Sequence, residues 1–306
     1  MAPIVINFGG YQKPASVHTR AAALFGEILG KELGERIRFE LIGDVLARGR
    51  KSGDLLPMVE RGELSCCYIS TVRFTGAVPE FRLLELPFVV KDRRSINEAL
   101  DGGLGDYFKR RVRETLPVRI LGFWDNGFRH FSNSVRPIRA PADCGGIRIR
   151  TQMSELHAEV FRTLGFEPLP ADVKEFVEEI ATGKFQAQDN PLTNIYNFGV
   201  HHYHRYITLS GHFFGASAFA CNEAQYQGWT AEVRAVVDAA ALEATALQRR
   251  LAAAEDAQVL ERFDPRDNEV LRLTEAEHAA FVDAVRPVTA KYRQELDPQL
   301  FAYLDR

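Results

Sequence analysis

The 306-residue sequence lacks the motifs that mark most enzymes and membrane proteins. No apolar stretch approaches the roughly 20 residues that span a bilayer. There is no Gly-x-Ser-x-Gly motif, no Gly-x-Gly-x-x-Gly motif after the first expected strand, and no phosphate-binding Gly-Lys-Ser/Thr run. A net charge of −3, with dispersed lysines and arginines, argues against a general attraction to nucleic acid. We therefore expect a globular protein with no cofactor and no nucleic-acid partner.

Cysteine is scarce, with four residues and no Cys-x-x-Cys spacing. Cys66 and Cys67 are adjacent, and a bridge between them would be strained because consecutive strand residues point to opposite faces. Cys144 and Cys221 are isolated, so we expect buried free thiols, which taken alone favour a reducing compartment. The N-terminus enters a strand directly, without a secretory signal. Either the protein is cytoplasmic, or an initiator Met has replaced a signal peptide.

The hydrophobic pattern up to Phe123 predicts alternating strands and helices. Strands are expected at Ile4–Phe8, Ile37–Ile42, Leu64–Ser70, within Leu83–Val90 and at Val118–Phe123, and helices at Ser16–Leu33, Asp54–Arg61, Arg94–Ala99 and Leu104–Thr115. Ser16 is the expected N-cap of the first helix. This alternation favours a parallel α/β sheet with helices on both faces.

A second unit is expected to begin near Trp124, at the turn signal Asn126-Gly127. Strands are expected at Phe128–Ser132, Ile147–Thr151, Tyr206–Leu209 and Ala216–Cys221, and helices at Glu155–Leu164, Val173–Thr182, Thr230–Phe263 and Glu275–Glu295. The helix at Thr230–Phe263 would extend about 50 Å at 1.5 Å per residue, so it is expected to run across two domains.

Ligands of open α/β sheets lie beyond the carboxyl ends of the strands. Those ends are here the loops Gly9–Pro14, Tyr68–Thr71 and Trp124–Arg129. The glycines Gly9 and Gly10 permit either a tight turn or a close backbone approach to a ligand.

Histidines His201, His202 and His204 fall within four residues, and His212 follows. A metal site would need ligands on one face with a carboxylate nearby, and this spacing lacks both. We favour a surface or hydrogen-bonding role for the cluster and predict no metal site.

Arg148 and Arg150 alternate with two isoleucines, so both arginines fit a solvent-facing strand surface. Arg150 equally fits a carboxylate site, because a guanidinium presents a planar fork of donors that matches a carboxylate in two places. Arg129, after the Asn126-Gly127 turn signal, has the same two interpretations. Position alone decides neither case.

A series of short motifs, in order and spacing, resembles the periplasmic solute-binding proteins of TRAP (tripartite ATP-independent periplasmic) transporters, the dicarboxylate- and sialate-binding type. The matching motifs are Leu86-Pro87-Phe88, Trp124-x-Asn126-Gly127-Phe128-Arg129, Arg136-Pro137-Ile138, Gly146-Ile147-Arg148-Ile149-Arg150, Gln188-Asp189-Asn190-Pro191, and Tyr206-Ile207-Thr208 with His212 and Asn222. The resemblance covers nearly the whole chain.

The resemblance implies an α/β fold of two lobes, with mixed sheets flanked by helices, joined by hinge strands and the long helix, and closing on a ligand in the cleft. The lobes would comprise 1–125 with about 212–252, and 126–211 with about 253–306. Arg150 would bind the ligand carboxylate, with Asn190 beside it and Arg129 nearby. The other candidate ligand-binding residues are Ser70, Tyr11, Tyr68, Met153, Val173, Phe214 and Trp124.

Departures from the family pattern bear on the ligand. Ser70 replaces an acidic residue of sialate binders, and Met153 and Val173 offer little hydrogen bonding. Hydroxyls of a long polyhydroxylated acid left unpaired there would cost about 1–3 kcal/mol each. We therefore predict a compact or partly aromatic monocarboxylate, or a small dicarboxylate, over a sialic acid.

Two function classes follow. The first is a non-catalytic, monomeric periplasmic receptor that delivers an organic acid to the integral-membrane subunits of a TRAP transporter. The second is a cytoplasmic, metal-dependent enzyme that acts on an organic acid through His201, His202 and His204. We predict the receptor, with no catalytic residue.

Overall fold

The computed structural model describes residues 2–304, which divide into two compact units. Unit 1 comprises residues 2–79, 97–125 and 216–253, and unit 2 comprises residues 80–96, 126–215 and 254–304. Among the α-helices and strands, four begin in one unit and end in the other: α3 (Arg93–Asp101), β4 (Val118–Asn133), β8 (Tyr206–Asn222) and α9 (Ala231–Arg262).

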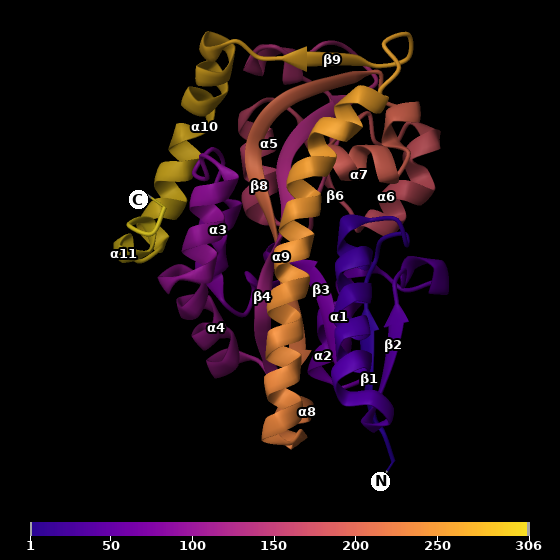
Figure 1. The fold of residues 1–306 in the computed structure, drawn as a ribbon. Coiled ribbons are helices and arrows are strands. Elements are labelled where there is room, and N and C mark those ends of the chain that lie inside the picture. The colour runs from indigo at the N-terminus through magenta and orange to yellow at the C-terminus, as the bar shows by residue number, and fades with distance from the viewer. Residues whose placement is uncertain (1, 305–306) are drawn as a thin grey trace. The chain divides into compact units, whose positions relative to one another are not determined.

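Unit 1 is built on strands whose order is β2-β1-β3-β8-β4 (Figure 1). Its strands are β1 (Ile4–Gly9), β2 (Ile37–Ile42), β3 (Cys66–Ser70) and the unit 1 parts of β4 and β8. Its helices are α1 (Val17–Leu33), α2 (Leu55–Glu60), α4 (Gly103–Thr115), α8 (Glu223–Gly228) and the unit 1 parts of α3 and α9. β1 runs parallel to β2 and β3, whereas β3 and β8 are antiparallel, so the sheet is mixed rather than parallel.

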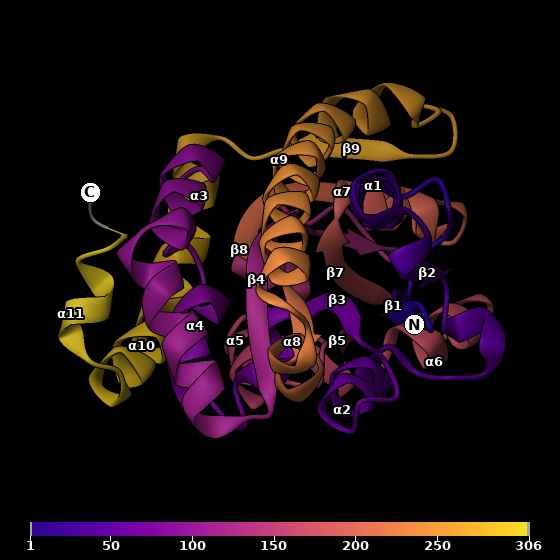
Figure 2. The same ribbon diagram turned by 60° about the horizontal axis from the view of Figure 1, so that its bottom comes forward.

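Helices cover both faces of the unit 1 sheet. Phe25 of α1 packs on Phe8 and Phe219 of the sheet, with ring centroids 6.0 and 5.0 Å apart. On the same face, Trp124 of β4 donates its indole N–H to Thr245 of α9. Phe123 points the opposite way and meets Phe108 of α4. Figure 2 shows α1 and α9 on one side of these strands and α4 on the other.

Unit 2 has the strand order β4-β7-β5-β6, with β9 paired to β8. Its elements are β5 (Arg148–Thr151), α5 (Glu155–Thr163), β6 (Glu167–Pro170), α6 (Val173–Glu179), β7 (Ala187–Pro191), α7 (Leu192–Asn197), β9 (Glu269–Arg272), α10 (Glu275–Glu295), α11 (Pro298–Phe301) and the unit 2 parts of α3, β4, β8 and α9. β5 is parallel to β6 and β7, and β4 is antiparallel to β7, so this sheet is also mixed.

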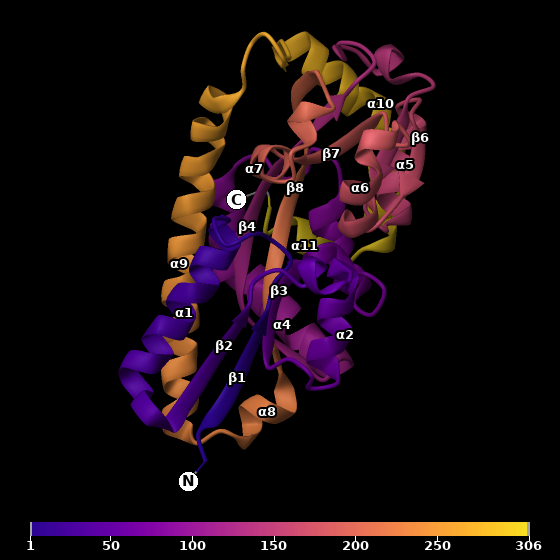
Figure 3. The same ribbon diagram turned by 90° about the vertical axis from the view of Figure 1, so that its right-hand side faces the viewer.

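Helices α5, α6, α7 and α10 lie around the strands of unit 2 (Figure 3), and each face of the sheet has its own core. On one face, Phe131 of β4 packs against Phe161 of α5 and Phe281 of α10. On the other, Phe176 of α6 and Phe185 belong to a cluster that includes residues of α7 and the end of α9. β7 is therefore buried on both sides, which fixes the direction of each of its side chains in the site described below.

Several predicted helices and strands are confirmed, and some predicted breaks are wrong. The helix predicted at Glu275–Glu295 has those bounds, and Ser16 caps α1 by accepting a hydrogen bond from the Thr19 N–H. The chain does not turn at Asn126-Gly127, because Gly127 takes a φ of +95° and β4 continues through it. β8 likewise replaces two predicted strands with one.

Leu83–Val90 contains no strand. A 3₁₀ helix at Pro79–Glu85 is followed by irregular backbone in which Phe88 has a φ of +58°. This segment belongs to unit 2 rather than to the expected first lobe. It is bound there because the Phe88 N–H donates to the His212 carbonyl at 2.9 Å, and because Glu85 contacts His157 at 2.9 Å.

All four cysteines are buried, as expected. Cys66 and Cys221 are register partners on neighbouring strands. Within residues 2–304, no helix combines the length and the apolar character needed to cross a membrane.

Candidate functional site

Arg150 on β5 is buried, with 4% of its surface exposed. Its Nε and Nη2 donate to the Ala171 carbonyl at 3.0 and 2.7 Å, and its guanidinium lies 5.4 Å from the centre of the Phe176 ring. Ala171 lies next to the end of β5, because its N–H donates to the Thr151 carbonyl. The solvent-facing interpretation of Arg150 is therefore wrong. Its guanidinium is held in one orientation inside the protein.

Asn190 shares the face of Arg150. In the β5–β7 ladder Arg150 lies opposite Gln188, and Asn190 is two residues further along β7, so all three side chains point the same way. The Asn190 amide donates to Gln188 Oε1 at 2.5 Å, and the Gln188 amide donates to Ser132 Oγ at 2.6 Å. The structure thus places Asn190 and Arg150 on one surface, with the Asn190 amide oriented by its neighbours.

Arg129 lies on the opposite face of the β4–β7 pair. Its Nε donates to Asp189 Oδ2 and its Nη2 to the Asp189 carbonyl, both at 2.5 Å, and both side chains are almost fully buried. Burial alone would raise the pKa of the Asp189 carboxyl, but Arg129 and His212 hold that pKa far below its usual value. The positive charge of Arg129 is therefore balanced within the protein, and its immediate role is to support β7.

The remaining unit 2 candidates differ in exposure. Val173, the first residue of α6, is 6% exposed, and Phe214 is 2% exposed with its ring 5.3 Å from that of Phe128. Met153 follows β5 and is 57% exposed.

In unit 1, Tyr68 and Trp124 organise the Gly9–Pro14 loop. The Tyr68 hydroxyl accepts hydrogen bonds from the Tyr11 and Gln12 N–H groups at 3.1 and 3.0 Å, and burial raises its pKa. Its ring stacks on Trp124 with centroids 5.6 Å apart. A Cβ on Gly10 would lie 2.4 Å from the Tyr68 ring, so the loop depends on glycine there. Ser70 ends β3 and is half-buried.

Sequence reasoning missed several buried polar groups. In unit 1 both ring nitrogens of His18 and the Ser217 hydroxyl have no hydrogen-bond partner among residues 2–304. Burial lowers the pKa of His18 to about 3, so the ring is neutral at pH 7. In unit 2 Thr151 Oγ1 and Asn126 Oδ1 are equally unpartnered in the described chain. For His18, Thr151 and Asn126 the available signal was nearness in sequence to the Gly9–Pro14 loop, to Arg150 and to Gly127, whereas Ser217 had no such signal.

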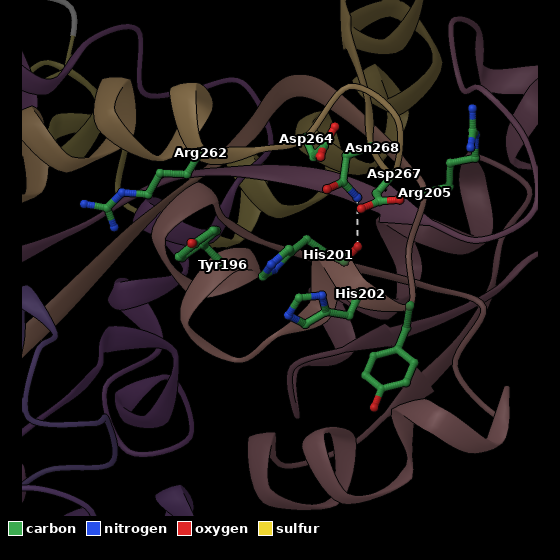
Figure 4. Close-up of a pocket in the computed structure, with 9 residues that line it drawn as sticks. Tyr196, His201, His202, Arg205, Arg262, Asp264, Asp267 and Asn268 are labelled. Atoms are coloured by element: carbon green, nitrogen blue, oxygen red, sulfur yellow. Dashed lines mark hydrogen bonds between the residues drawn. The ribbon is translucent and has the colours of Figure 1, made fainter.

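The histidine cluster does not converge on one point. His201 and His202 line a cavity of about 590 Å³ with Tyr196 and Asn268 (Figure 4). His204 is buried elsewhere, with Nδ1 bonded to Ser132 at 3.0 Å and Nε2 to the Phe185 carbonyl at 3.2 Å. Among the residues that the structure describes, no group of three or more His, Cys, Asp or Glu side chains is arranged to hold a metal ion.

Comparison with known families identifies the kind of protein that this site belongs to. The model of the DctP family, described as bacterial extracellular solute-binding protein family 7, matches residues 8–295. The chain belongs to this family. Its members are the solute-binding proteins of TRAP transporters, as the sequence motifs predicted. The cytoplasmic enzyme alternative has no support from the family or from the histidine geometry.

Individual relatives agree with this assignment. A Sinorhizobium fredii protein, uncharacterized protein y4mM, is 30% identical over 95% of this chain, which spans only 53% of that relative's length. The 2,3-diketo-L-gulonate-binding periplasmic protein YiaO of Escherichia coli is 26% identical over 92% of this chain and 84% of its own length. Among solved structures, the sugar acid binding protein DctPAm of Advenella mimigardefordensis in complex with galactonate has a TM-score of 0.94, at 23% identity, covering 100% of this chain and 98% of that one. This DctP-family chain therefore has the two-lobed fold of these binding proteins.

Proposed function

We propose that this DctP-family chain is an extracytoplasmic receptor that binds a small organic acid. Arg150 carries the proposal. It is buried and oriented by the Ala171 carbonyl, and it shares a sheet face with Asn190. A guanidinium fixed in a water-poor site binds a carboxylate through paired, charge-assisted hydrogen bonds that a solvated arginine cannot match.

Unit 1 offers further candidate contacts to the ligand in this proposal. The Gly9–Pro14 loop with Tyr11, the end of β3 at Ser70, and the buried ring of His18 are the groups we assign to this role. The family resemblance implies hinge closure, in which a ligand that contacts residues of both units shifts the population to the closed form. The four elements that pass from one unit to the other are the natural hinge.

The ligands named for relatives include sugar acids and dicarboxylates: 2,3-diketo-L-gulonate for the Escherichia coli protein, galactonate for the Advenella protein and a C4-dicarboxylate for the DctP protein of Rhodobacter capsulatus. We assign this chain a small organic acid, and we retain the prediction of a compact monocarboxylate or small dicarboxylate. A hydroxylated sugar acid is the competing ligand. The unpartnered polar atoms of His18, Ser217 and Thr151 can each bond a ligand hydroxyl.

We further propose that the receptor works as a monomer in the periplasm and delivers its ligand to the membrane subunits of a TRAP transporter. A secretory signal ahead of the mature chain is part of this proposal. Cell fractionation of the native gene product, followed by N-terminal sequencing, tests the location.

A thermal-shift screen tests the binding function. The panel pairs each acid, such as succinate, galactonate, pyruvate and a sialic acid, with its amide or ester. We expect at least one acid of the first three to raise the unfolding temperature while its uncharged partner does not, because only the acid can pair with Arg150. Stabilisation by none of a broad panel of organic acids would contradict the receptor proposal.

A further inference from the structure

Unit 2 contains a cavity that none of the ten predicted ligand-binding residues lines. Its volume is about 640 Å³, within the usual range for small-molecule sites. It is bounded by the Phe88–Arg93 segment, β4, the start of α7, β8, α9, β9 and α10. All of these lining residues belong to unit 2, so the cavity is a property of that unit alone.

The walls of the cavity are mainly apolar. The apolar lining residues are Phe88, Val90, Phe128, Leu192, Leu209 and Leu260. Phe88 reaches its position through a left-handed backbone (φ +58°), an unfavourable conformation for an aromatic residue. Its N–H bond to the His212 carbonyl and the edge contact of its ring with His278, at 5.0 Å, hold it there. The fold thus maintains a strained residue as one wall of the cavity.

The charged lining residues leave an excess of positive charge. Arg93 of α3 is paired with Asp256 of α9 and lies against the Phe128 ring. Lys91 and Arg272 also line the cavity, are exposed, and form no ion pair within residues 2–304. Two cations are therefore available beside an apolar chamber, an arrangement that suits an anion with an apolar body.

His130 adds an uncharged hydrogen-bond donor to the cavity lining. The Gly211 N–H donates to His130 Nδ1 at 3.0 Å, so the neutral ring carries its proton on Nε2. Burial lowers the pKa of His130 to about 3, so the ring remains neutral at pH 7. The lining therefore offers one neutral N–H donor in addition to the two cations.

We propose that this cavity is a second ligand site, which takes an amphiphilic monocarboxylate. The apolar body of the ligand lies between Phe88, Phe128 and Leu260, and its carboxylate is bound by Lys91 and Arg272. This site is independent of Arg150, and its occupancy does not require the proposed receptor function.

The test uses the full chain carrying Arg150→Ala, so that the first site does not contribute. Phenylacetate is titrated by calorimetry, with phenylacetamide as the uncharged probe of the same shape. We expect saturable binding of phenylacetate, and at least about tenfold weaker binding of the amide, equivalent to about 1.4 kcal/mol.

Charge reversal locates the site. Lys91→Glu with Arg272→Glu, both at exposed positions, should abolish the binding, whereas Arg250→Glu, an exposed arginine of α9 outside the cavity, should leave it unchanged. A crystal soaked with 4-bromophenylacetate should show bromine between Phe88 and Leu260. No saturable binding at millimolar phenylacetate would overturn the proposal, and so would equal affinity in the Lys91→Glu/Arg272→Glu protein.

Discussion

Removing the charge of Asp189 is the perturbation whose effect the structure predicts most sharply. In Asp189→Asn the side chain keeps its size, but Arg129, with 3% of its side chain exposed, loses its counter-ion. Breaking a buried pair by removing one partner leaves an uncompensated charge and costs about 3–5 kcal/mol. We expect a loss of that size in the free energy of unfolding, measured by urea denaturation at pH 7 with circular dichroism.

The pH dependence supplies an internal check on this prediction. The pKa of Asp189 is depressed in the folded protein, so its contribution is present above the unfolded pKa of about 3.9 and is lost as the pH falls below it. Asp189→Asn should therefore weaken the acid-induced loss of stability as well as lower stability at pH 7. Asp283→Asn, which removes an exposed partner of Arg286 on α10, is the matched control and should change little. An Asp189→Asn protein as stable as the control would refute the reasoning.

Two further predictions concern packing and the thiols. Gly105→Ala places a Cβ 1.8 Å from the Leu100 carbonyl oxygen and should destabilise unit 1 by about 1–3 kcal/mol. Gly30→Ala, with open space around its Cβ, should stabilise α1 by about 0.5–1 kcal/mol. Paired urea titrations check both changes, and equal effects on stability would contradict the local geometry. Burial raises the pKa of the Cys66, Cys67 and Cys144 thiols, so an alkylating reagent at pH 8 should label none of these three in the native reduced protein and all of them in urea. Mass spectrometry reads the labels, and rapid native labelling would show that these sites open.

The fold was predictable where local signals agree with the tertiary structure. The helix at Glu275–Glu295 and the Ser16 cap of α1 were both predicted, and the structure adds a capping box at Thr274 to the first. The predicted break at Asn126-Gly127 failed because the same dipeptide serves a hairpin turn or a strand with one left-handed glycine. Only the register of β4 with β7 distinguishes them, and that register involves residues about 60 positions away in sequence.

The family motifs predicted the site in outline, whereas the local pattern of polar and apolar residues did not. The alternation of Arg148 and Arg150 with isoleucines predicts nothing about which arginine is buried. The difference arises because Ala171 and Phe176 enclose Arg150, whereas Arg148 donates to the carbonyls of Lys184 and Gly183 near the surface. Likewise, the pairing of Arg129 with Asp189 needs the facing strands β4 and β7, which no local pattern specifies.

The central claim is that Arg150 binds the carboxylate of the ligand, and one calorimetric comparison tests it. The acid found by the thermal-shift screen is titrated into the wild-type chain, Arg150→Ala and Arg148→Ala, the last being a matched change on the same strand. Losing the partner of a buried, hydrogen-bonded charge costs about 2–5 kcal/mol, so Arg150→Ala should weaken binding by about 30-fold or more. Arg148→Ala should bind as the wild type does. Wild-type affinity in a folded Arg150→Ala protein would contradict the account.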